Sequence, residues 1–193
     1  MTTMSIQYTN RLGQIYYLCQ GITKTGKPKY FFSTKIDGNR VNVIPDDFEI
    51  YENPNAQVFL IKKVAPLITD LEKQAVISSI KKNKSIEHYI LDVKKEYITI
   101  YTAKQNLVFA EESWVARLRQ LTDFKPSLLG LNYMTEMRFQ LVDVENRYFM
   151  AERFCYRSSI DDWIIICEPD RLSSLVKYIA HVGKDSFYEL SLY

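Results

Sequence analysis

Two pairs of adjacent aspartates are candidate ligands for a divalent metal ion. Asp46-Asp47 and Asp161-Asp162 each stand just before an expected strand, and carboxylate oxygens are the groups that hold metals in hydrolases and nucleases. The first pair follows a proline, as in one nuclease motif, but the next strand has no acid two residues before a lysine. The alternative is a turn or strand cap, because aspartate readily hydrogen-bonds its own backbone.

A stretch of lysines and aromatic residues is the main candidate for binding nucleic acid. Lysines contact phosphates, and exposed aromatic rings stack on unpaired bases. Because neighbouring residues of a strand point to opposite faces, Phe31 faces away from Tyr30 and Phe32, and one of these faces belongs to the core. The alternative is a solvated strand edge whose lysines discourage aggregation. The candidate residues are Lys24, Lys27, Lys29, Tyr30, Phe32 and Lys35.

Three arginines form a second candidate surface. Arg147, Arg153 and Arg157 all have odd numbers, so they share one face if they belong to one regular strand. The planar guanidinium group suits carboxylate or phosphate recognition. The alternative is local ion pairing with neighbouring acids, namely Glu145, Glu152, Asp161 and Asp162.

Other catalytic motifs are absent from the sequence. The three cysteines form no CxxC pair, and neither His88 nor His181 has a Cys or His at ligand spacing. Glycine-rich phosphate loops are also missing. The sequence therefore predicts no bound metal or other cofactor, and cysteines that are buried thiols in a reducing cytoplasm.

Composition indicates a globular protein with a real core. Of the 193 residues, 47% are hydrophobic and 25% are charged, values typical of folded domains. No apolar run approaches the roughly 20 residues of a membrane span, so a membrane partner is not expected. The net charge of +2 is too small to indicate nucleic acid by itself, whereas 14 tyrosines favour an interface.

The pattern of strands and turns predicts an α+β fold in two parts. Residues 1–64 read as a small antiparallel β module with two hairpins, one at Asp37-Gly38 and one at Asn53-Pro54-Asn55. Residues 65–193 read as an antiparallel sheet with helices packed on one face. Helices are expected from Pro66 to Lys82, at 111–121 and from Pro169, and a last strand at 187–190.

The larger part contains a possible degenerate duplication. Residues 91–97 resemble residues 142–148, which suggests two similar units at about 86–122 and 137–182. The alternative is that two hairpins use similar residues because hairpins require them.

Three stretches carry a resemblance to known sequences. They are residues 23–32, residues 49–59 and residues 159–163. With these stretches the chain resembles, over most of its length, a family of uncharacterised bacterial proteins with no known activity. The resemblance implies a bacterial, cytoplasmic protein and assigns no catalytic residue.

These observations favour a non-catalytic binding or adaptor protein. Its expected partner is either another protein or nucleic acid, bound through the basic-aromatic hairpin. A metal-dependent hydrolase or nuclease that uses the paired aspartates is the alternative.

Overall fold

The computed structural model describes residues 5–35, 39–103, 131–157 and 160–192. Contacts divide the chain into two compact units, an N-terminal unit of residues 1–64 and a C-terminal unit of residues 65–193. The helix expected at 111–121 and much of the first suggested repeat lie outside the described residues. Within the described part, no helix is long and apolar enough to cross a membrane. The fold is α+β, with mainly antiparallel sheets, as predicted.

The N-terminal unit consists of two small antiparallel sheets. In the first, β2 is the central strand, and β1 and β4 lie on one of its edges and β3 on the other. The second sheet is the hairpin of β5 and β6, which confirms the turn predicted at Asn53-Pro54-Asn55. The strands are β1 (Gln7–Thr9), β2 (Ile15–Ile22), β3 (Pro28–Ser33), β4 (Asn39–Arg40), β5 (Phe48–Glu52) and β6 (Val58–Lys62).

The hairpin predicted at Asp37-Gly38 is wrong. Cys19 of β2 pairs with Phe31 of β3 and also with Arg40 of β4, so β3 and β4 lie on opposite edges of β2. The reason is that β2 is buried at Cys19 and its neighbour Leu18. Backbone groups at a buried position need hydrogen-bond partners on both edges, and β4 supplies the second edge.

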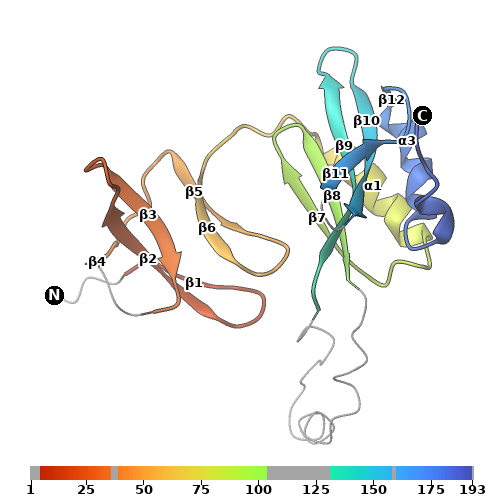
Figure 1. Ribbon diagram of the computed structural model, residues 1–193. Helices are drawn as coiled ribbons and strands as arrows, with labels where there is room; N and C mark the ends of the chain where they lie inside the picture. Colours follow the sequence, from red (N-terminus) through yellow and green to blue (C-terminus); the bar gives the residue numbers. More distant parts are fainter. Residues whose placement is uncertain (1–4, 36–38, 104–130, 158–159, 193) are drawn as a thin grey trace, which may run out of the picture. The chain divides into compact units, whose positions relative to one another are not determined.

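The C-terminal unit is built on one large antiparallel sheet. Its strands follow the order β11-β10-β9-β8-β7, and β12 adds to β10. Figure 1 shows α1 and the C-terminal helices on the same side of this sheet. The strands are β7 (His88–Lys94), β8 (Tyr97–Ala103), β9 (Met134–Asp143), β10 (Tyr148–Arg157), β11 (Ile160–Ile165) and β12 (Asp170–Arg171).

The core lies between that sheet and its helices. Alternate strand residues face the helices, so β8 contributes even positions whereas β9 and β10 contribute odd ones. The helices contribute their apolar sides, which confirms the prediction that they pack on one face. Fully buried members are Val76, Ile80, Ile98, Ile100, Met137, Phe139, Phe149, Ala151 and Ile179.

Helix α1 (Asp70–Lys82) begins four residues later than predicted. Its N-cap is Thr69, whose hydroxyl accepts a hydrogen bond from the backbone N–H of Glu72, and Glu72 accepts one from the Thr69 N–H in return. This capping box provides hydrogen-bond partners for N–H groups at the helix start. Pro66, where the sequence predicts the helix to begin, has a hydrocarbon ring that cannot accept such bonds. Arg147 then donates its Nε–H to Glu72 over 3.0 Å, which ties the helix start to the turn before β10.

The C-terminal helix is short and irregular. It consists of α3 (Leu172–Leu175) followed by the 3₁₀ helix η3 (Val176–His181). The strand predicted at 187–190 is wrong, because a second 3₁₀ helix, η4 (Asp185–Phe187), forms there. Phe187 is buried in the core, and the N–H of Tyr188 bonds locally to the Asp185 carbonyl instead of to a neighbouring strand.

One buried asparagine joins the end of α1 to η3. The Asn83 side chain is 7% exposed and donates to the backbone carbonyls of Ile179 (2.7 Å) and Val182 (2.9 Å). Its side-chain oxygen accepts from the N–H of Ser85 over 2.9 Å. All its polar atoms are thus used, and the Ile179 carbonyl, which also accepts from the Val182 N–H, gains a second donor while the Val182 carbonyl gains one.

We predict that Asn83→Ala lowers the free energy of unfolding of the C-terminal unit by about 1–3 kcal/mol, because it removes the buried side-chain hydrogen bonds to Ile179 and Val182. The measurement is chemical denaturation followed by circular dichroism. Gln74→Ala, at an exposed position of α1, is the matched control and is expected to change the stability by less than about 0.5 kcal/mol. Equal effects of the two substitutions would contradict the role given to Asn83.

The pairing of Glu72 with Arg147 predicts a pH dependence of stability. Burial alone would raise the pKa of Glu72, but hydrogen bonds from Arg147 and Thr69 outweigh it and hold the pKa below its ordinary value. A carboxyl group with a lowered pKa stabilises the fold above its unfolded pKa, and this contribution is lost as the pH falls through the folded pKa.

We therefore expect Arg147→Met to be less stable than the wild type near pH 6, and the difference to shrink at about pH 3. Thermal unfolding across this range measures it. Arg171→Met, at an exposed position, should show no such convergence. A difference that is constant with pH would contradict the ion pair as its cause.

Candidate nucleic-acid interface

The two faces of the β1–β4 sheet differ in burial. One face is formed by even positions of β2 and β3, and Leu18, which is 0% exposed, pairs there with Phe32. On the same face Tyr8 donates its hydroxyl hydrogen to Glu52 of β5 over 3.0 Å. Burial and the neighbouring Glu52 carboxylate raise the pKa of Tyr8 above its ordinary value. This side of the sheet is the inner one, packed toward the β5–β6 hairpin.

The opposite face carries an exposed aromatic ring and cations. We call it the Phe31 face and define it by Tyr17, Gly21, Lys29, Phe31 and Arg40. In the sheet, Phe31 pairs with Cys19, and Lys29 pairs with Gly21. Cys19 is buried, whereas the Phe31 side chain is 41% exposed, and Lys29 and Arg40 are exposed as well.

The absence of a side chain at Gly21 positions the Phe31 ring. A Cβ atom at residue 21 would lie 3.3 Å from Cε1 of Phe31, so the ring rests close to the glycine backbone. On the other edge of β2, the Arg40 guanidinium lies 4.8 Å from the centre of the Tyr17 ring, within the range of a cation–π contact. The face therefore offers one ring partly open to solvent and a guanidinium stacked on a second ring.

Further lysines lie in the exposed segments at both ends of β3. Lys24 and Lys27 lie in the exposed turn between β2 and β3, where the N–H of Lys27 bonds to the Thr23 hydroxyl over 3.1 Å. Lys35 follows β3, and its N–H bonds to the hydroxyl of Ser33. None of the strands β1 to β4 contains an acidic residue. Anions approaching the four strands meet lysine and arginine without a carboxylate among the strand residues.

The lysines predicted from sequence are exposed, and the two aromatic residues are not equally so. Tyr30 and Phe32 are half-buried on the inner face with Leu18. Sequence reasoning passed over Phe31 as a site residue and did not consider Tyr17 or Arg40. The available signal was the strict alternation of strand residues, which required a choice between Phe31 and its two neighbours.

Two of the three predicted arginines make internal contacts. Arg147 precedes β10 and bonds to Glu72 and to the Leu67 carbonyl. Arg153 is 6% exposed and donates its Nε–H to the Leu190 carbonyl over 2.6 Å. Arg157 belongs to β10, but its side chain lies outside the described residues. The Arg147 and Arg153 side chains are thus committed to the fold.

The two aspartate pairs lie in different kinds of local structure. Asp46 and Asp47 are exposed in the turn before β5, where the Phe48 N–H bonds to the Pro45 carbonyl. Asp161 and Asp162 are neighbours within β11, so their side chains point to opposite faces. Among the described residues, no group of three or more His, Cys, Asp or Glu side chains is placed to hold a metal ion.

Comparisons of the chain with protein-family models, with curated proteins and with solved structures found no match in any of the three.

The alternation across β3 predicts unequal effects of two neighbouring substitutions. Phe31→Ala should change the free energy of unfolding of the N-terminal unit by less than about 1 kcal/mol, because the ring is already 41% exposed in the fold. Phe32→Ala should cost about 2 kcal/mol or more, because it removes packing opposite Leu18. Chemical denaturation of the full chain measures both. A larger loss for Phe31→Ala would reverse the assignment of the two faces.

Proposed function

We propose that the protein is a non-catalytic binding protein whose partner is single-stranded nucleic acid, held on the Phe31 face. The observation that carries the proposal is a partly exposed aromatic ring flanked by Lys29 and Arg40 on acid-free strands. Sheets that bind single strands combine these features, since rings stack on bases while cations follow the phosphates.

Each side chain has a distinct part in this scheme. The Phe31 ring provides a stacking platform for one unpaired base, because it is 41% exposed to solvent. Lys29 and the turn lysines Lys24 and Lys27 neutralise phosphates along the backbone. Arg40, stacked on Tyr17, adds a planar donor group that suits phosphate oxygens.

The same geometry predicts weak sequence preference. Stacking accepts every base, because each base has an aromatic face. Duplex DNA keeps its bases stacked inside the helix, so Phe31 gains nothing from it and only the charge contacts remain. We therefore expect single strands to bind more tightly than duplexes of equal length.

We predict that the protein raises the fluorescence anisotropy of a labelled 15-nucleotide oligothymidine at low salt, and that Phe31→Ala weakens this binding roughly 5- to 100-fold. The range reflects the loss of about 1–3 kcal/mol for one stacked base. Lys29→Ala should weaken binding too, and should reduce the salt dependence of the affinity by about one phosphate contact.

The matched control is Phe59→Ala. Phe59 is 44% exposed, lies in β6 of the same unit and stacks on Tyr51, so its loss removes an exposed ring from a different sheet. The affinity of the Phe59→Ala variant for the oligothymidine should match that of the wild type within about twofold. Wild-type binding that is absent at low salt, or equal losses for Phe31→Ala and Phe59→Ala, would contradict the proposal and leave a protein partner for this face.

A further inference from the structure

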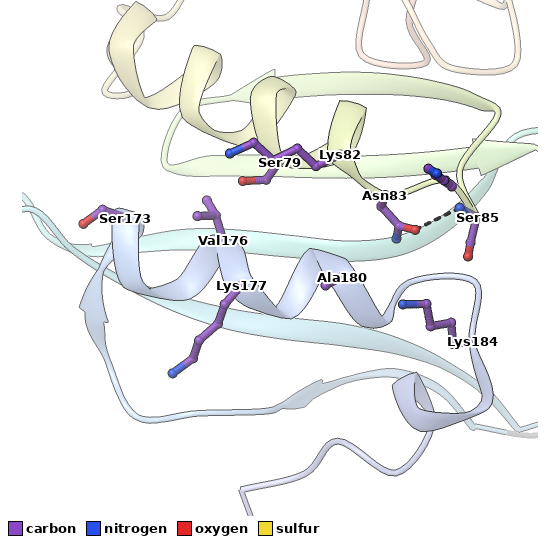
Figure 2. A pocket seen from close by; sticks show the side chains of 10 residues that line it. Ser79, Lys82, Asn83, Ser85, Ser173, Val176, Lys177, Ala180 and Lys184 are labelled. Atoms are coloured by element: carbon purple, nitrogen blue, oxygen red, sulfur yellow. Dashed lines mark hydrogen bonds between the residues drawn. The ribbon is translucent and has the colours of Figure 1, made fainter.

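A groove in the C-terminal unit lies between the end of α1 and residues 172–181. Its volume is about 490 Å³, within the range of small-molecule sites. Figure 2 shows Ser79 and Lys82 on the α1 side and Val176 and Lys177 on the side of the C-terminal helix. All lining residues belong to the C-terminal unit, so the groove does not depend on the N-terminal unit.

Four lysines line this groove, and they come from separate places in the sequence. Lys82 and Lys84 stand at the end of α1, Lys177 lies on η3 and Lys184 follows η3. No acidic residue lines the groove. Within the described ranges, none of the four is in an ion pair, although Lys177 lies 5.2 Å from the Tyr178 ring.

The absence of carboxylates is informative because other lysines of this unit do have acidic partners. Lys73 pairs with Asp70 over 2.9 Å, and Lys94 pairs with Asp92 over 3.6 Å. Lysine side chains that line one groove repel each other, although Figure 2 shows the Lys177 side chain extending away from α1. An anion bound among them relieves this repulsion, whereas a cation or an apolar ligand does not.

Neutral hydrogen-bond donors complete the lining. The hydroxyls of Ser79, Ser85 and Ser173 contribute from α1, from the loop after it and from α3. Asn83 fixes the distance between the two sides, because its side chain is bonded to residues of both. Gly183, in the turn after η3, has φ +82°, and a Cβ atom there would lie 3.1 Å from that of the lining residue Ser85, so the turn requires glycine.

We propose that this lysine groove binds the phosphate groups of a small polyphosphorylated ligand. Several lysines from separate segments match the multiple negative charges of a triphosphate better than the one or two of a single phosphate. The volume also accommodates a group attached to the phosphates, with Val176 and Ala180 as the apolar part of the lining. The lysine groove belongs to a different unit from the proposed nucleic-acid interface, and its proposed ligand does not depend on that interface.

The test is isothermal titration calorimetry of the full chain with inorganic tripolyphosphate at low salt. Binding should be saturable and weaken as salt is added, and sulfate should bind at least about tenfold more weakly. Ala180→Glu places a carboxylate among the lysines at an exposed position, and is expected to lower the affinity by at least about tenfold. Lys82→Ala should lower it roughly three- to tenfold.

Two matched variants exclude a general effect of charge. Ser78→Glu makes the same charge change as Ala180→Glu at an exposed α1 position outside the groove, and Lys81→Ala removes the lysine beside Lys82. Both should stay within about twofold of the wild type. Absence of saturable binding, or equal losses in Ser78→Glu and Ala180→Glu, would overturn the proposal.

A second titration distinguishes the sources of the phosphates. If adenosine triphosphate binds more tightly than tripolyphosphate and the gain is lost in Ala180→Glu, the ligand is a nucleotide. If instead the 15-nucleotide oligothymidine displaces tripolyphosphate and Ala180→Glu weakens the oligonucleotide too, the groove holds backbone phosphates of nucleic acid. If Phe31→Ala then leaves the affinity for the oligonucleotide unchanged, only the proposed role of the Phe31 face is contradicted.

Discussion

Alternation of side chains along the strands is the constraint on which both units depend. In β10, Phe149 and Ala151 face the helices and are fully buried, and Arg153 is carried to the same side by the two-residue period. Its guanidinium must find an acceptor there, and the Leu190 carbonyl provides one. Glu152, one residue earlier, faces the other side and pairs with Arg138. A shift of one residue would reverse all these environments at once.

A single side chain then determines how the helices meet beside that sheet. Apolar side chains such as Ile80 of α1 and Ile179 of η3 belong to the common core, but hydrophobic contacts are not directional. The hydrogen bonds of Asn83 to Ile179 and Val182 are directional and favour the observed alignment. That alignment sets the lysines of two separate segments around one groove. The stability of the helix contact and the geometry of the candidate anion site therefore have a common cause.

Much of the fold follows from local patterns, and the rest depends on contacts distant in sequence. The strands of the large sheet and the β5–β6 hairpin could be predicted because alternation and turn residues act over a few positions. The place of β4 could not, because its partner is Cys19, about twenty residues earlier. Likewise, the run from Lys81 to Lys84 reads as a helix end, and only the fold brings Lys177 and Lys184 beside it.

The small net charge of the whole chain does not show which charged residues are paired within the fold. The 25 basic and 23 acidic residues almost cancel, yet several acids are bound to particular cations within the fold. Glu52 pairs with Arg11, Glu72 with Arg147 and Glu152 with Arg138. Each such pair removes an acid and a base from the long-range field. By contrast, strands β1 to β4 and the lining of the lysine groove contain basic residues and no acidic ones, a local difference that the net charge of the chain does not reveal.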